Sequence, residues 1–169
     1  MKETVQEYVQ RIRGNVAGKD PLKVQGATAK KLAGLIKGAP ASKLRKRPEP
    51  EKWSVAEILA HLAEAEIVIC WRVRAILGAP GIAIQAYDQD AWAQAGQYAK
   101  RDARKSLEEF RELREMNLAF YKRLTPEQWN HHGMHSERGE ESIGRLAEMM
   151  AGHDINHLEQ IAKILARKK

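Results

Sequence analysis

The sequence predicts an all-α fold, a four-helix bundle with crossover connections and short extra helices. Every long stretch of periodic apolar residues has helical spacing, and no run alternates apolar and polar residues well enough to indicate a sheet. Capping signals and glycine–proline breaks divide the chain into four long helices, whose apolar faces must be buried against one another. At 169 residues, we expect a single domain that spans 1–169.

The first long helix is predicted to begin at Asp20, after a short amphipathic segment. Asp20 is a capping residue, and Pro21 suits the first helical position. The helix should end by Gly38. The linker 42–52 contains two prolines and five basic residues, so we expect an extended surface segment there.

The second long helix has the clearest start in the chain. Ser54 is its cap, and Glu57 follows at the position that completes a capping box. Apolar residues then recur with helical spacing up to Gly78, where the segment Gly-Ala-Pro-Gly ends the helix.

Two further long helices are predicted in the second half. The third spans about 102–124, and Thr125 with Gln128 marks a short capped turn after it. A glycine-containing loop over 130–141 precedes the last helix, which spans about 142–167.

Charge distribution argues against a nucleic-acid partner. The 29 Lys and Arg against 22 Asp and Glu give a formal charge of +7. Basic residues gather only in 43–47 and 167–169, which are interpreted as solvated flanks, and no nucleic-acid-binding motif accompanies them. We therefore expect no nucleic-acid partner.

The lone cysteine and the N-terminal residues favour a cytoplasmic protein. Cys70 has no partner for an intramolecular disulfide, so nothing indicates an oxidising compartment. The first residues are charged and polar where a signal peptide needs an apolar core. No apolar run approaches the ~20 residues of a membrane span, so we expect no membrane association.

Three histidines have the pattern of a catalytic metal site. His153 and His157 are four residues apart on the last helix, so both rings lie on one face and can reach a single ion. His61 on the second helix can supply a third ligand. Three protein ligands leave a coordination position open for water or substrate, whereas a structural site usually takes four. Imidazole ligands suit Zn²⁺ and Ni²⁺.

Two carboxylates fall within the apolar faces of the helices that carry these histidines. Asp154 is on the last helix and Glu66 is on the second. Either could orient a ligating imidazole or act as a catalytic base. The alternative is a buried ion pair with Arg72 or Arg138.

Polar residues of the connecting segments are candidates for orienting a small-molecule substrate. We expect Tyr87 and Asp88, together with His135 and Arg138, to lie beside the open metal position. For Tyr87 and Asp88 the alternative is ordinary packing and an Asp-led turn. The histidines at 131–132 are adjacent in a solvated loop and are expected at the surface.

The sequence resembles the DinB-like superfamily, also called the DinB/YfiT-like metalloenzymes, from about residue 20 to 167. The segments that carry the resemblance are Trp53–Glu66, Tyr87–Trp92, His135–Gly139 and Ala151–Ile161. The resemblance implies a four-helix bundle and a divalent metal held by three histidines. These map onto His61, His153 and His157 without substitution.

The resemblance also implies a range of reactions. Better understood relatives include bacillithiol-dependent S-transferases and mycothiol-dependent maleylpyruvate isomerases, and many others are called metal-dependent hydrolases. We therefore expect a metal-dependent hydrolase or an S-transferase that uses a low-molecular-weight thiol, although no motif here marks a thiol cofactor. The alternative is a non-catalytic small-ligand or metal-binding module, and the resemblance leaves a homodimer open.

Overall fold

The computed structural model describes residues 3–167, so Lys168 and Lys169 of the predicted basic flank lie outside the described residues. In chain order, the elements are α1 (Val5–Gly14), α2 (Pro21–Ile36), α3 (Ala41–Arg45), α4 (Val55–Gly78), β1 (Ala83–Ile84), α5 (Gln89–Ala95), η1 (Tyr98–Lys100), α6 (Ala103–Tyr121), η2 (Gln128–Asn130), β2 (His132–His135), β3 (Gly139–Ser142) and α7 (Ile143–Ala166).

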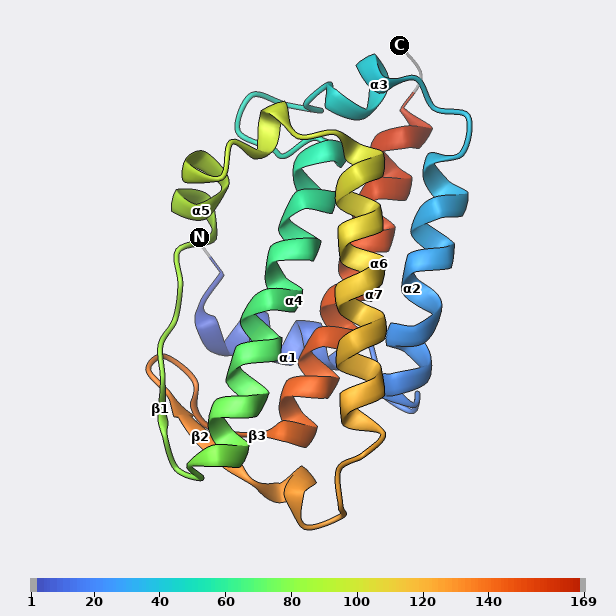
Figure 1. The fold of residues 1–169 in the computed structure, drawn as a ribbon. Coiled ribbons are helices and arrows are strands. Elements are labelled where there is room, and N and C mark those ends of the chain that lie inside the picture. Colours follow the sequence, from blue (N-terminus) through green and yellow to red (C-terminus); the bar gives the residue numbers. More distant parts are fainter. Residues whose placement is uncertain (1–2, 168–169) are drawn as a thin grey trace.

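The helices α2, α4, α6 and α7 form the predicted four-helix bundle (Figure 1). Each packs against two neighbours, in the cyclic order α2, α6, α4, α7. The helices α4 and α6 run in one direction, whereas α2 and α7 run in the other. Because α4 and α6 are parallel neighbours, the chain between them must cross back over the length of the bundle. Residues 79–102 form this crossover.

The predicted capping signals are confirmed. The side chain of Asp20 accepts hydrogen bonds from the first turn of α2, and Ser54 and Glu57 form both bonds of the capping box that begins α4. After α6, the backbone N–H of Thr125 donates to Gln128 Oε1 at 2.9 Å, and the N–H of Gln128 donates back to Thr125 Oγ1 at 3.3 Å. Local side-chain chemistry therefore fixes these starts.

A three-stranded sheet at one end of the bundle departs from the prediction of helices and loops alone. The strands lie in the order β1, β2, β3, with β1 parallel to β2 and β2 antiparallel to β3. The predicted loop 130–141 is largely this hairpin. Its strands have only four residues each, too few for a convincing alternation. Gly139 permits the tight turn, because it adopts a positive φ of 73°.

The linker 42–52 also differs from the extended, solvated segment that was predicted. Its start is the short helix α3, which buries Leu44 in the core. Arg47 is bound to the buried carboxylate of Glu57, with its Nε atom 3.1 Å from both oxygens. One member of the basic run therefore supports the start of α4.

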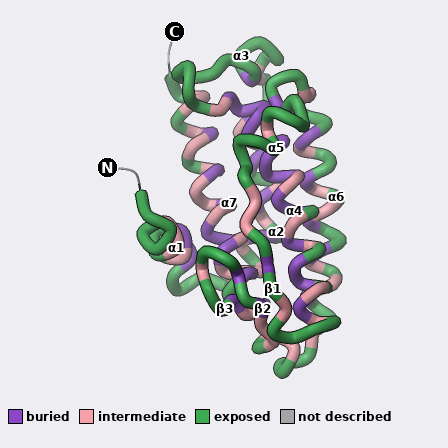
Figure 2. The backbone as a smooth tube through the Cα atoms, turned by 90° about the vertical axis from the view of Figure 1, so that its left-hand side faces the viewer, coloured by how far each residue is buried: buried purple, intermediate pink, exposed green. Residues whose placement is uncertain are grey.

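The bundle interior consists of two apolar clusters separated by a polar layer. Figure 2 marks buried residues along all four long helices. One cluster surrounds Ile58 and Phe110, and the other surrounds Ile76 and Ile143. Between them lie buried polar side chains from every long helix, namely Gln25, Thr28, Glu66, Arg114, Asn117 and Asp154. No helix within residues 3–167 is long and apolar enough to cross a membrane.

Candidate metal centre

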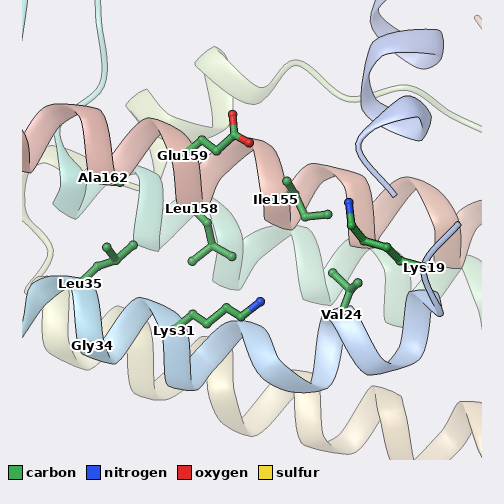
Figure 3. A pocket seen from close by; sticks show the side chains of 9 residues that line it. All are labelled: Lys19, Val24, Lys31, Gly34, Leu35, Ile155, Leu158, Glu159 and Ala162. Carbon is green, nitrogen blue, oxygen red and sulfur yellow. The ribbon is translucent and has the colours of Figure 1, made fainter. Parts of the chain in front are cut away.

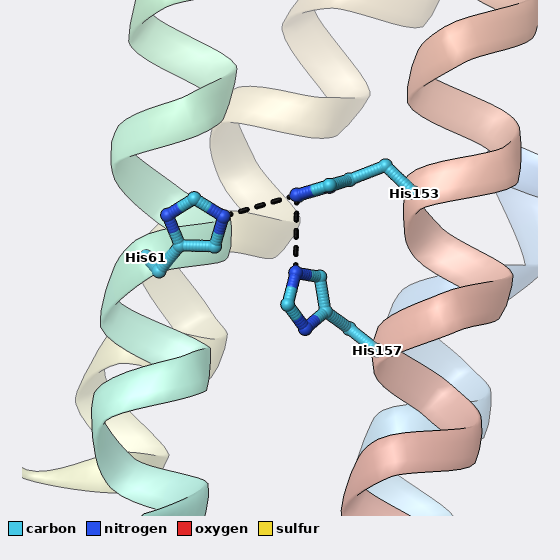
Figure 4. Close-up of side chains that lie close together, drawn as sticks. All are labelled: His61, His153 and His157. Carbon is cyan, nitrogen blue, oxygen red and sulfur yellow. Dashed lines mark hydrogen bonds between the residues drawn. The ribbon is translucent and has the colours of Figure 1, made fainter. Parts of the chain in front are cut away.

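Three imidazole rings meet between α4 and α7. His61 extends from α4, and His153 and His157 extend from successive turns of α7 (Figure 4). The Nε2 atom of His153 lies 3.0 Å from Nε2 of His61 and 3.0 Å from Nε2 of His157. Among residues 3–167, these three form the one group of His, Cys, Asp or Glu side chains that could hold a metal ion. The structure therefore brings together the three histidines that the sequence singles out.

The spacing of the three nitrogens fits a divalent ion. A Zn–N bond is about 2.0–2.1 Å long, so two nitrogens separated by about 90–110° on one ion lie roughly 2.9–3.4 Å apart. Hydrogen bonds alone do not account for the arrangement. The Nε2 atom of His153 faces two other nitrogens, but a neutral ring nitrogen either donates one bond or accepts one. An ion shared by three lone pairs satisfies all three rings.

Burial keeps the three rings neutral, as metal ligation requires. Burial and, to a smaller extent, the neighbouring His157 together lower the pKa of His61 to about 3. Burial also lowers the pKa of His153 well below its ordinary value, with both other histidines acting in the same direction. The pKa of His157 is likewise lowered by burial, although Gln160 and Asp154 oppose the effect. All three lone pairs are therefore available near neutral pH.

Neighbouring side chains orient two of the rings. The Nδ1 atom of His157 donates to Gln160 Oε1 at 2.8 Å, which leaves the Nε2 lone pair directed at the other histidines. The indole ring of Trp53 lies 5.0 Å from the ring of His61, centroid to centroid, and covers it. His61 itself is two turns from the capped start of α4, whose position Ser54 fixes.

The two carboxylates proposed as catalytic candidates are bound to an arginine that the sequence analysis did not select. Arg114 of α6 donates from Nη1 and Nη2 to Asp154 at 2.5 and 3.0 Å, and from Nη2 to Glu66 at 2.7 Å. The ion-pair alternative is therefore the observed one, but with Arg114 in place of Arg72 or Arg138. Neither carboxylate makes a hydrogen bond to a clustered histidine.

A polar hollow of about 240 Å³ opens beside His153 and His157. Its other walls come from α1, from the segment before α4, from the start of α5 and from α7. The residues that complete the lining are Tyr8, Glu51, Lys52, Trp53, Gln89, Asp90, Asn156 and Gln160. Aromatic, charged and amide side chains thus surround the exposed side of the cluster.

The four side chains expected to orient a substrate do not line this hollow. Asp88 instead caps α5, where its Oδ1 atom accepts two backbone N–H bonds. Tyr87 lies just before that cap, while His135 and Arg138 belong to the hairpin region. The adjoining residues 89–90 do line the hollow. The crossover therefore contributes to the hollow through its residues 89–90, and the substrate-orienting roles of Tyr87, Asp88, His135 and Arg138 stay predictions.

Sequence reasoning missed Tyr8, an aromatic residue that lines the hollow. Tyr8 reaches the site because α1 lies against α7, outside the bundle (Figure 2). Gly152 allows this contact, since a Cβ there would lie 1.9 Å from the carbonyl oxygen of Ile12. In the sequence, Gly152 next to His153 is the feature that could have indicated this close contact. Gln160 was also missed, although its position three residues after His157 places both on one helix face.

A larger depression of about 620 Å³ lies between α2 and α7, away from the histidine cluster (Figure 3). Its lining is mainly apolar, with Val24, Leu35 and Leu158 among its residues, and Lys31 and Glu159 at its edges. It contains no group of potential metal ligands. The smaller hollow is therefore the better candidate for an active site.

The fold and the cluster together define a four-helix-bundle protein in which three inward-facing histidines from two helices form a candidate metal site. A family model described as the DinB superfamily matches residues 26–161. The chain therefore belongs to the DinB superfamily, as the resemblance indicated.

Individual relatives agree with this assignment. Two proteins of Oceanobacillus iheyensis carry the name "Putative metal-dependent hydrolase". One is 26% identical over 116 residues, which cover 69% of this chain and 67% of the relative, and the other is 24% identical over 109 residues, which cover 64% and 62%. In fold, the chain matches YfiT from Bacillus subtilis, described as a probable metal-dependent hydrolase with an unusual four-helix bundle topology. The TM-score is 0.79 at 21% identity, covering 85% of this chain and 83% of that chain.

Proposed function

We propose that this protein is a metal-dependent hydrolase of a small molecule, with one divalent ion, Zn²⁺ or Ni²⁺, held by His61, His153 and His157. The observation that carries the proposal is the meeting of three neutral imidazoles, with Nε2 of His153 3.0 Å from Nε2 of both His61 and His157. The names of its relatives support hydrolysis, and no observation favours a thiol cofactor. The ion would supply Lewis acidity, which polarises a carbonyl or phosphoryl oxygen and lowers the pKa of water.

The residues around the ligands limit what can bind. A hollow of about 240 Å³ is smaller than the roughly 300–1,000 Å³ of most small-molecule sites, so it favours a small substrate. Tyr8 and Trp53 can enclose the apolar part of such a molecule, while Asn156 and Gln160 offer amide groups for hydrogen bonds.

Proton transfer in this proposal involves carboxylates other than the two first selected. Asp154 and Glu66 are engaged by Arg114 inside the bundle, so they are positioning residues of the polar layer. Glu51 and Asp90 line the hollow. We assign the role of proton acceptor to one of these two, because a general base must reach its proton directly or through one water.

A panel of small esters, amides and phosphate esters tests the proposal. The metal-loaded protein should hydrolyse at least one class, lose turnover with a chelator and regain it with Zn²⁺ or Ni²⁺. His153→Ala should abolish turnover, whereas His132→Ala, on the exposed hairpin, should not. Absence of turnover from a protein that holds one ion per chain would favour the non-catalytic binding module. Turnover that persists in both the chelated protein and His153→Ala would reject the metal mechanism.

A further inference from the structure

A second buried polar group lies where the sheet meets α4. It contains Arg72 of α4, His135 of β2 and Glu141 of β3, which are only 7%, 3% and 3% exposed. Arg138 of the hairpin turn completes it, because its Nε and Nη2 atoms both donate to Glu141. None of these four residues is part of the histidine cluster or of the hollow beside it.

The register of the sheet brings Arg72 and His135 together. Parallel pairing places Ile84 of β1 opposite His135. The next residue, Gln85, accepts a hydrogen bond at its carbonyl oxygen from Arg72 Nη2 at 2.6 Å. His135 and Glu141 are the buried positions near the ends of their strands, so both belong to the face that is covered by the bundle.

The charges of this group do not cancel. Arg138 is bound to Glu141 through two hydrogen bonds of 2.8 and 2.7 Å, so these two charges neutralise each other. Arg72 has no carboxylate partner within residues 3–167, and its Nη2 atom donates to the carbonyl oxygen of Gln85 instead. Burying a charge without a counter-charge is costly. One positive charge is therefore in excess in a nearly solvent-free position.

His135 adds an unused hydrogen-bond donor. Its Nδ1 atom accepts the backbone N–H of Glu137 at 3.2 Å, so the neutral ring carries its proton on Nε2. Burial is the main cause that lowers the pKa of His135 to about 4, with the charges of Arg138 and Arg72 acting in the same direction and Glu141 opposing them. The buried Nε2 atom has no hydrogen-bond partner within the described residues.

We propose that Arg72 and the Nε2–H group of His135 bind the carboxylate of a small organic acid. A singly charged carboxylate fits better than a phosphate dianion, because the excess is one positive charge. It also offers two acceptor oxygens, one for the guanidinium and one for the imidazole.

The guanidinium carbon of Arg72 lies 5.9 Å from the ring centre of Tyr87, so an aromatic ring adjoins the proposed anion site.

Acetate is the simplest probe of the anion site. In the metal-loaded protein labelled with ¹⁵N, acetate should produce a saturable shift of the His135 ring signals, whereas the neutral isostere acetamide should not. Arg72→Met keeps the aliphatic stem but removes the charge, and it should weaken acetate binding by about tenfold or more, the typical effect of losing a hydrogen bond to a charged group. Arg74→Met is the matched control, because Arg74 is an exposed residue of the same helix that faces Phe120.

The outcomes separate this inference from the hydrolase proposal. Acetate binding that depends on Arg72, without turnover of any substrate, would reject the hydrolase and leave the anion site standing. Turnover of a substrate by the native protein, together with no acetate-induced shift at His135, would reject the anion site alone. Equal acetate affinity in the native protein and Arg72→Met would also reject it. If Arg72→Met does not fold, the native protein still tests the anion site. Equal shifts of the His135 ring signals with acetate and with acetamide would reject it.

Discussion

Arg114 and Asp154 form a buried ion pair with two hydrogen bonds, next to the candidate metal centre. Arg114 Nη1 and Nη2 lie 2.5 and 3.0 Å from the two carboxylate oxygens, and both side chains are at most 2% exposed. Asp154 directly follows His153 on α7, so the pair fixes the helix that presents two of the three imidazoles. Thr28 also donates to Asp154, at 2.8 Å, which connects α2 to the same carboxylate.

Replacing Arg114 with Met should strongly destabilise the fold, because it leaves Asp154 and Glu66 buried without a counter-charge. Breaking a buried pair on one side typically costs about 3–5 kcal/mol. Urea denaturation followed by circular dichroism measures the loss. Arg111→Met is the control, since the Arg111 side chain of the same helix is 43% exposed and forms only surface ion pairs, so the unfolding midpoint should stay nearly unchanged. A native midpoint in Arg114→Met would show that the polar layer does not hold the bundle together.

The parts of the fold that were predictable from sequence depend on short-range chemistry. The capping box of Ser54 and Glu57 and the proline at the start of α2 act within one helical turn, so they are legible without a structure. The sheet was not predictable, because its two- to four-residue strands are too short to show alternation and β1 pairs with a strand about 50 residues away. The pairing depends on tertiary contacts.

In the candidate site, too, the features set by short-range spacing were predictable and those set by tertiary packing were not. The spacing of His153 and His157 implies a shared ligand, and the third histidine follows once α4 packs against α7. The partner of Asp154 could not be read from sequence, because Arg114 lies 40 residues away on another helix, in a long amphipathic segment with several arginines. The position of Tyr8 at the hollow could not be predicted either, because it depends on how closely α1 packs against α7.

The purified protein should contain about one divalent ion per chain, because His153 Nε2 lies 3.0 Å from two other ring nitrogens and the three neutral imidazoles are otherwise incompletely satisfied. Elemental analysis by mass spectrometry gives the ratio of metal to protein. The double variant His153→Ala, His157→Ala should lose the ion, whereas His132→Ala should retain it. Native metal content in the double variant would place the ion elsewhere.

Gln160→Leu should weaken metal binding without removing it. The substitution deletes the acceptor that holds His157 Nδ1–H at 2.8 Å, so the ring loses both its fixed tautomer and its orientation. Loss of such a partner typically lowers metal affinity by about 10–100-fold. Competition with a chromophoric chelator measures the affinity. Glu159→Ala, at the exposed neighbouring position, serves as the control, and equal affinities in the two variants would show that Gln160 does not orient the ligand.

Gly152→Ala should separate α1 from α7 and open the wall of the hollow that carries Tyr8. The added Cβ would lie 1.9 Å from the carbonyl oxygen of Ile12 and 2.8 Å from its carbonyl carbon. Both contacts are with backbone, which no side-chain rotation can relieve, so α1 itself must move. Overpacking of this kind typically costs about 1–3 kcal/mol.

Hydrogen exchange detects the displacement of α1 directly. Amides of Val5–Gly14 should exchange faster in Gly152→Ala, while amides of α4 and α6 keep their native protection. Gly144→Ala is the matched control on the same helix, because its Cβ would meet only ordinary contacts at 3.6 Å or more. Metal content should remain near native in both variants, since the three ligands extend from α4 and α7. Native protection of α1 in Gly152→Ala would show that this close contact is not what holds Tyr8 at the site.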